Sequence, residues 1–180
     1  LHHFSHMDET KPVQTDIHEC VEITLLILKN RFKNGIEVVK NYGELPLVRG
    51  YSGQLSQVFL NLLVNALDAL TEHAADREID NQGLDDWQPQ IEITTKVIET
   101  EDGKWAAISI ADNGPGIPLE NQQQIFDTFF TTKPVGKGSG MGLAICDQIV
   151  TEKHGGKLKL RSQPGQKTEF EILLPIVCKT

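Results

Sequence analysis

Cysteine, long apolar runs and excess basic charge are all scarce in this sequence. The three cysteines, Cys20, Cys146 and Cys178, are widely separated and form no CxxC pair, which argues against a disulfide framework and predicts a reduced, cytoplasmic setting. No apolar run approaches the ~20 residues of a membrane span, and no signal peptide is visible. We therefore expect no membrane contact from this fragment, whereas its parent protein can still be membrane-attached.

The charge balance argues against a further class of partner. The formal net charge is -8, whereas a nucleic-acid surface normally carries a basic excess, so no nucleic-acid partner is expected. An acidic chain can still hold a phosphate ligand, because clustered backbone N–H groups bind anions locally. With 180 residues, 39% of them hydrophobic and 23% charged, the chain has the composition of one globular domain.

Hydrophobic periodicity predicts helices alternating with antiparallel strands. Helices are expected at 16–32, 52–71 and 143–153, and strands at 36–40, 91–97, 106–110, 157–162 and 168–175. The acidic stretch 72–89 is predicted to be an exposed loop, and 112–142 an irregular, glycine-rich segment. The fold class that follows is α/β (α+β): a two-layer sandwich of helices on a mixed, mainly antiparallel sheet.

An unusual polar stripe lies on the second predicted helix. At 100° per residue it groups Gln57, Asn61, Asn65 and Asp68 opposite an apolar face. Asparagine is a poor helix former, so an ordinary solvated face would carry Lys, Glu or Arg instead. Amide and carboxylate oxygens can hold Mg²⁺. The alternative is that the stripe packs on a neighbouring loop through ordinary hydrogen bonds.

A second polar feature follows the strand at 106–110. Period-two alternation places Asp112 on the buried face, where a carboxylate needs a hydrogen-bond donor. An adenine amino group is one such donor, and Gly114 and Gly116 would let a planar ring approach the backbone. A plain turn capped by the aspartate is the alternative. Thr168, on an apolar face of the last strand, also needs a polar partner.

The glycine-rich stretch that ends at Leu143 precedes the third predicted helix. Four glycines alternate in 136–142, with Lys133 and Lys137 close by. Such a segment can present N–H groups to phosphates at a helix N-terminus, although a flexible hinge is the alternative. Phe126, Phe129 and Phe130 are expected either to be core anchors or to anchor a lid over the site.

In this order, the segments resemble the histidine-kinase branch of the gyrase, Hsp90, histidine kinase and MutL ATPase superfamily. The resemblance covers about 12–175 and rests on an asparagine box at 61–69, a first glycine box at 112–116, a phenylalanine box at 126–133 and a second glycine box at 138–143. It implies a Bergerat-type fold that binds ATP and Mg²⁺ between helices and sheet, in a catalytic domain at 13–180. Residues 1–12 are then the tail of a preceding dimerisation hairpin or an expression scar.

The resemblance also implies a role for each site residue. Asn65, with Asn61, would hold Mg²⁺, and these two asparagines, Lys133 and Lys137 would support catalysis by positioning and charge neutralisation. Adenine-side contacts are expected from Asp112, Gly114, Gly116, Ile117 and Thr168. The two lysines and the backbone around Gly138, Gly140, Met141, Gly142 and Leu143 would hold the phosphates, and Asp68, Phe130 and Ser139 complete the expected ATP contacts.

The phosphate acceptor is expected to lie outside this sequence. Kinases of this kind phosphorylate a histidine that is followed by an acidic residue and, a few positions later, by proline. His6 has both residues displaced, and His18 lacks the proline. The expected partners are therefore a histidine-bearing dimerisation hairpin of the same parent protein and a downstream response regulator. Two alternatives are a serine kinase of the same superfamily and an ATP-sensing module without transfer activity.

Overall fold

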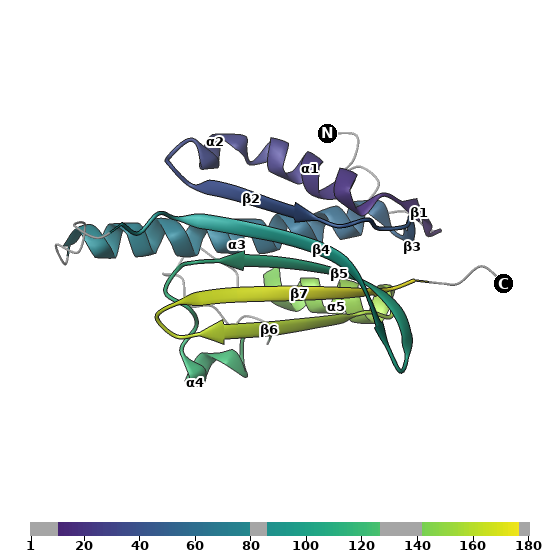
Figure 1. Ribbon diagram of the computed structural model, residues 1–180. Helices are drawn as coiled ribbons and strands as arrows, with labels where there is room; N and C mark the ends of the chain where they lie inside the picture. The colour runs from purple at the N-terminus through teal and green to yellow at the C-terminus, as the bar shows by residue number, and fades with distance from the viewer. Residues whose placement is uncertain (1–10, 80–85, 127–141, 177–180) are drawn as a thin grey trace.

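The computed structural model describes residues 11–79, 86–126 and 142–176, which form two layers (Figure 1). The strands are β1 (Val13–Thr15), β2 (Glu37–Tyr42), β3 (Val48–Gly50), β4 (Gln90–Thr100), β5 (Gly103–Asp112), β6 (Lys157–Gln163) and β7 (Lys167–Pro175). The helices are α1 (Ile17–Ile27), α2 (Lys29–Phe32), α3 (Ser52–Ile79), α4 (Leu119–Gln122) and α5 (Gly142–Gln148), and α5 continues into a π-helical turn, Ile149–Lys153.

The main sheet has five strands in the order β2-β4-β5-β7-β6. Strands β2 and β4 are parallel, and every other neighbouring pair is antiparallel, so the predicted mixed, mainly antiparallel sheet is confirmed. A second sheet pairs β1 with β3. These strands were not predicted, because three residues are too few for alternation to be visible.

Helices α1, α3 and α5 cover one face of the main sheet, with α3 in the middle. The core lies between the layers: α3 contributes Phe59 and Leu63, and the sheet contributes Ile93, Ile108 and Ile172, all with no exposed surface. Helix α1 begins where Asp16 caps it, since the Asp16 carboxylate accepts a hydrogen bond from the Glu19 N–H. The helical layer thus holds α3 against the sheet along much of its length.

The predicted loop at 72–89 is wrong over its first half. Helix α3 continues to Ile79, because 72–79 contains two alanines, two glutamates and an arginine, which are good helix formers. Tertiary contacts support this extension: Trp87 packs edge-on against His73, and the Arg77 guanidinium lies 4.8 Å from the Trp87 ring centre. Within 112–142, predicted to be irregular, the short helix α4 is present.

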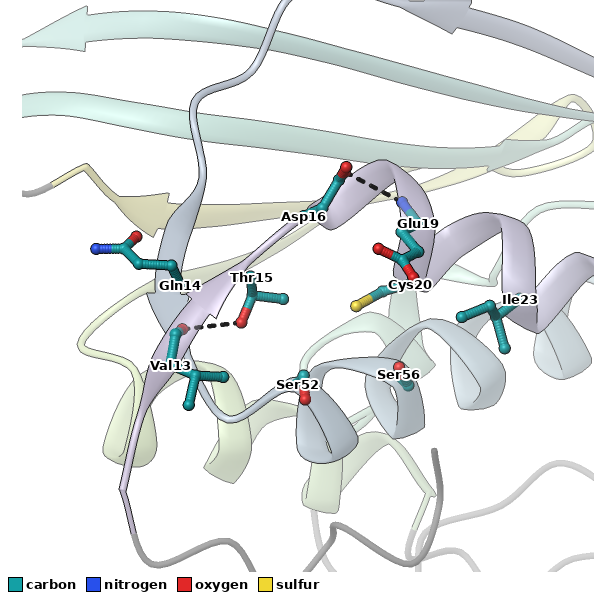
Figure 2. Close-up of a pocket in the computed structure, with 9 residues that line it drawn as sticks. All are labelled: Val13, Gln14, Thr15, Asp16, Glu19, Cys20, Ile23, Ser52 and Ser56. Atoms are coloured by element: carbon teal, nitrogen blue, oxygen red, sulfur yellow. Dashed lines mark hydrogen bonds between the residues drawn. The ribbon is translucent and has the colours of Figure 1, made fainter. Parts of the chain in front are cut away.

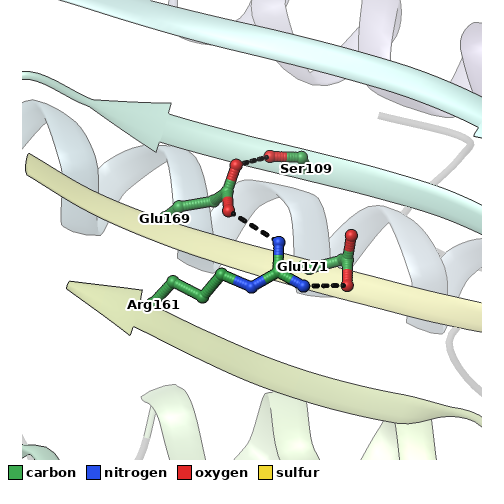
Figure 3. A network of polar contacts seen from close by, with 4 residues as sticks. All are labelled: Ser109, Arg161, Glu169 and Glu171. Carbon is green, nitrogen blue, oxygen red and sulfur yellow. Dashed lines mark hydrogen bonds and ion pairs between the residues drawn. The ribbon is translucent and has the colours of Figure 1, made fainter.

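The open face of the sheet carries a small ionic network (Figure 3). The Arg161 guanidinium lies 3.3 Å from Glu169 and 3.5 Å from Glu171, and the Ser109 hydroxyl donates to Glu169 at 2.7 Å. Surface ion pairs contribute about 0–1 kcal/mol each, so this network links β5, β7 and β6 without dominating their stability.

None of the described helices is both long and apolar enough to cross a bilayer.

His154 joins the start of α3 to the turn that follows α5. Its Nε2 accepts the Tyr51 backbone N–H at 3.0 Å, and its Nδ1 lies 2.9 Å from the Ile149 carbonyl oxygen. Because an N–H can only donate and a carbonyl can only accept, the ring must be neutral with its proton on Nδ1. Burial lowers the pKa of His154 below its usual value of 6.5.

The His154 bridge predicts a pH-dependent stability. The unfolded chain binds a proton at His154 near pH 6.5, whereas the folded chain resists it, so stability falls as the pH decreases below that value. We expect His154→Gln to remove this contribution. Urea unfolding of both proteins between pH 7.5 and pH 5 checks it, because all other titrating groups cancel in the difference. Parallel curves would show that His154 is not the group involved.

Candidate functional site

Asp112 and Thr168 lie side by side where β5 and β7 reach the same edge of the sheet. The register pairs them directly across the two strands, and both are buried, with 6% and 5% of their surface exposed. They share the inner face with Ile110 and Phe170, beneath the helices. The structure therefore brings together two predicted site residues that are 56 positions apart in the sequence, and it places both at the interface between the layers.

The Asp112 carboxylate sits in an unusual electrostatic environment. Burial raises its pKa from 3.8 to about 6, although the Gly114 N–H, which donates to Oδ1 at 2.9 Å, opposes the shift. One oxygen is thus engaged by the backbone of its own loop. Because a buried carboxylate is stabilised by further donors, this group is suited to accept a hydrogen bond from a neutral N–H donor such as an exocyclic amine.

The loop after β5 is held against the turn between β6 and β7. The Ile117 N–H donates to the Ser162 hydroxyl at 2.8 Å, and that hydroxyl donates to the Lys167 carbonyl at 2.9 Å. The Gly165 N–H donates to the Pro115 carbonyl at 2.5 Å. Ser162 also lies 3.4 Å from the Thr168 hydroxyl, so a single serine connects the loop with the Asp112–Thr168 pair. No motif in the sequence pointed to Ser162.

Two glycines permit this close approach. Gly116 has φ +75°, and a Cβ there would collide with the carbonyl oxygen of Gln163. A Cβ at Gly114 would lie 2.8 Å from Asp112 Oδ1 and 3.7 Å from Leu70 Cδ2 of α3. The first glycine box is therefore packed between the sheet edge and α3, and it leaves no space for side chains at these two positions.

Gly116→Ala should destabilise the protein by about 1–3 kcal/mol, because it combines a left-handed backbone with a steric collision. Gly35→Ala is the matched control: Gly35 has φ +86° but nothing within 4 Å of the Cβ position. Thermal and urea unfolding of both variants separates the two contributions. Equal losses would mean that the Gln163 contact is relieved at no cost, and that backbone conformation alone explains the glycine.

The predicted asparagine stripe lies on the exposed side of α3. Gln57, Asn61, Asn65 and Asp68 are all half-buried, while the apolar positions of the helix, such as Leu62 and Leu63, are buried. The Asn61 Nδ2 is 3.5 Å from the carbonyl oxygen of Gly142, the first residue of α5. Asn61 thus faces the start of the helix that follows the second glycine box, as a site between the two requires.

These residues fit the coordination chemistry of Mg²⁺. Because Asn61 points its Nδ2 toward a carbonyl, its side-chain oxygen is left to accept or coordinate. Among the described residues, no three His, Cys, Asp or Glu side chains form a metal-binding group. Mg²⁺ is commonly bound by only one or two protein oxygens, together with phosphate oxygens and water. The side-chain oxygens of Asn61 and Asn65 are of the right type and number for the protein's share of such a coordination shell.

Helix α3 connects the two halves of the site. The backbone carbon of Ala69 lies 3.8 Å from the Cβ position of Gly114, and Asn65 and Asn61 lie one and two turns earlier on the same helix. At 1.5 Å per residue, the eight residues from Asn61 to Ala69 span about 12 Å. The site is therefore elongated, with the buried carboxylate at one end and the asparagines at the other.

Asp68 has a partner that no sequence pattern indicated. Its Oδ1 accepts a hydrogen bond from the Arg31 Nη2 of α2 at 2.9 Å, which forms an ion pair. Arg31, Asp68, Thr71 and Glu72 line a pocket of about 290 Å³. The Asp68 carboxylate is therefore paired with a cation from another helix, and its contact with ATP stays a prediction.

The other predicted residues have mixed outcomes. Leu143 is half-buried and packs on the core, and Phe126 packs edge-on against Phe170 with 6.2 Å between ring centres, so Phe126 is a core anchor. Asn113, within the first glycine box, bonds instead to the Gln90 N–H and the Gln88 carbonyl of the chain leading into β4. Seven predicted contacts lie outside the described residues: Phe130, Lys133, Lys137, Gly138, Ser139, Gly140 and Met141.

A separate pocket of about 220 Å³ lies at the start of α1 and α3 (Figure 2). Its walls come from β1, α1 and α3 and include Asp16, Cys20 and Ser56. None of the predicted site residues lines it. The elongated site along α3 is therefore the candidate that the geometry supports.

Comparison with known sequences gives a consistent result. A family model described as histidine kinase-, DNA gyrase B- and HSP90-like ATPase matches residues 50–177. Sporulation kinase C of Bacillus subtilis (strain 168) is 31% identical over 157 residues, which are 86% of this chain and 32% of the relative. The sensory histidine kinase/phosphatase NtrB of Azospirillum brasilense is 32% identical over 172 residues, which are 93% of this chain and 41% of the relative. The chain thus spans about a third to two-fifths of these relatives' length.

Solved structures share the fold over nearly the whole chain. A mycobacterial sensor histidine kinase, MprB, superposes with a TM-score of 0.67 at 28% identity and covers 92% of this chain and 96% of its own. The catalytic domain of the histidine kinase ThkA superposes with a TM-score of 0.72 at 24% identity, with the same coverage of both chains. At that identity the second likeness concerns the fold, and it agrees with the layered arrangement described above.

Proposed function

Because the chain belongs to the family of histidine kinase-, DNA gyrase B- and HSP90-like ATPases, we propose that it binds Mg-ATP and donates the γ-phosphate to a histidine on a dimerisation hairpin of its parent protein. One observation carries the proposal. The Asp112–Thr168 pair and its glycine loop lie at one end of an elongated site, and Asn61, which faces Gly142, lies with Asn65 at the other end along α3.

At the buried end, we assign adenine to the Asp112 carboxylate. The Asp112 carboxylate keeps acceptor capacity beyond its bond to the Gly114 N–H, and this would accept the exocyclic amino group of adenine. Gly114 and Gly116 would act indirectly, because they let the loop pack tightly beside Asp112. The Thr168 hydroxyl, 3.4 Å from Ser162, would complete the polar contacts, and Ile117 follows in the same loop. This end of the site would select the base, because only a base with an N–H donor in the right place would give the buried carboxylate a further hydrogen bond.

At the other end, we assign the phosphates and Mg²⁺ to Asn65 and Asn61. The metal would supply neutralisation of the negative charge on the phosphates. The two asparagines would hold the triphosphate in line with α3 and thereby orient the γ-phosphate for transfer. On the resemblance alone, we also assign phosphate contacts to Lys133, Lys137 and the backbone of 138–143. The chain's contribution to catalysis would be positioning and electrostatics.

The acceptor is proposed to be a histidine of a separate hairpin. Within this chain, His18 is occupied by packing, because its ring stacks on Tyr42 at 4.5 Å and its Nε2 lies 2.7 Å from the Thr95 hydroxyl. The relatives named above are histidine kinases or a sporulation kinase, which favours histidine over serine as the acceptor. A response regulator would then receive the phosphate from that histidine.

The decisive experiment mixes the chain with γ-labelled ATP, Mg²⁺ and the parent protein's hairpin. We expect label on the hairpin that is lost in acid and retained in base, as phosphohistidine requires. Acid-stable label would identify a serine kinase instead. ATP binding without transfer to any hairpin would leave an ATP-sensing module. Failure of the chain to bind ATP at all would overturn the proposal.

A further inference from the structure

The ion pair between Arg31 and Asp68 links two helices beside the proposed phosphate end of the site. Arg31 belongs to α2, a four-residue helix separated from α1 by Leu28, and its Nη2 donates to Asp68 Oδ1 of α3 at 2.9 Å. The side chains are 40% and 26% exposed, so both remain accessible to a ligand arriving from solvent. The contact spans 37 positions of sequence and is therefore a product of the tertiary fold.

Helix geometry places Asp68 among the residues assigned to the metal and phosphates. It lies about 20° around the helix axis from Asn61 and about 60° from Asn65. Residues three apart on a helix have Cβ atoms about 5–6 Å apart, so Asp68 is next to Asn65. Without Arg31, the negative charge of this carboxylate would be less compensated and would oppose a triphosphate. Glu72, one turn further along and lining the same pocket, would add to that repulsion.

We propose that Arg31 is a positioning residue of the nucleotide site: by pairing with Asp68 it cancels the carboxylate charge that would otherwise oppose the phosphates. The inference rests on the proposed function. Arg31 acts through Asp68 and takes no part in the transfer itself. Because the interaction between charges grows with the charge of the ligand, its contribution should increase with the number of phosphates, which a purely structural tether between α2 and α3 would not do.

The test measures the affinity of Arg31→Gln for Mg-ATP, Mg-ADP and adenosine. We expect a loss of about 3- to 10-fold for Mg-ATP, a smaller loss for Mg-ADP and none for adenosine. Arg31→Lys, which keeps the charge, should restore most of the affinity. The double variant Arg31→Gln/Asp68→Asn should bind Mg-ATP within about twofold of the parent sequence, because it removes both charges. Added salt should shrink the difference between Arg31→Gln and the parent sequence.

Lys29→Gln is the matched control, since Lys29 is an exposed basic residue of the same helix. Equal losses for all three ligands, no loss in Arg31→Gln, or no recovery in the double variant would each overturn the inference. Its failure is distinguishable from failure of the proposed function. Suppose that Asn65→Ala weakens Mg-ATP binding, but that the loss of affinity in Arg31→Gln does not increase with the number of phosphates. Then only the role of Arg31 is wrong.

Discussion

An Asn65→Ala chain is expected to fold at least as well as the parent sequence yet to bind Mg-ATP about 100-fold more weakly or worse. Asn65 is half-buried on the outer stripe of α3, and alanine is a better helix former than asparagine by up to about 0.7 kcal/mol. Removing the side chain therefore costs the helix nothing. Substituting a residue that only hydrogen-bonds to a metal ligand already costs about 10–100-fold in metal affinity. Loss of a direct ligand should therefore cost at least as much.

Isothermal titration with ATP, in the presence of Mg²⁺ and of EDTA, checks the Asn65 prediction alongside thermal unfolding. The unsubstituted chain should lose affinity when Mg²⁺ is removed, and Asn65→Ala, which keeps only Asn61 as a metal ligand, should respond much less to the metal. Glu78→Ala is the control, because Glu78 is an exposed residue near the end of the same helix. A metal response that persists in Asn65→Ala would assign the metal to other residues.

Asp112→Asn is expected to stabilise the unliganded protein while weakening ATP binding by about 10- to 100-fold. Asparagine can still accept the Gly114 N–H through its oxygen, but its NH₂ group would then face the adenine amino group, donor against donor. The same change should narrow the preference for ATP over GTP, because the guanine oxygen is an acceptor.

The stability half of this prediction has a defined pH dependence. The folded protein binds a proton at Asp112 up to about pH 6, whereas the unfolded chain does so only up to about 3.8. Stability contributed by the protonated group is therefore lost as the pH rises from about 4 to 6. Above that window, Asp112→Asn should be more stable than the parent sequence by up to about 3 kcal/mol.

Urea unfolding of Asp112→Asn at pH 4, 5, 6 and 7 measures this difference. Asp102→Asn serves as the control for the substitution itself, since Asp102 lies in the exposed turn at the other end of β5. If Asp112→Asn destabilises the protein at pH 7, the carboxylate must be stabilised by donors other than the Gly114 N–H. If ATP affinity is unchanged, adenine does not contact Asp112.

Much of this protein was determined by local sequence alone. Alternation at 106–112 predicted that Asp112 faces the core, and the register across β5 and β7 agrees. The helical spacing of Asn61 and Asn65 predicted one polar stripe, because side-chain direction in a regular helix depends only on position in the chain. The glycines at 114 and 116 were expected to let a flat ring approach the backbone, whereas in the structure they let the loop pack against Gln163, Asp112 and Leu70.

Other features were decided only when distant segments met. Helix α3 extends past Thr71 to Ile79, where Trp87 packs against His73 and Arg77, although the polar composition of 72–79 resembles a loop. Ser162 reaches the glycine loop from β6. Arg31 pairs with Asp68 across 37 positions. Periodicity indicates which way a side chain points within its own helix or strand. Which residue it contacts depends on how helices and strands pack together, and no single segment of sequence carries that information.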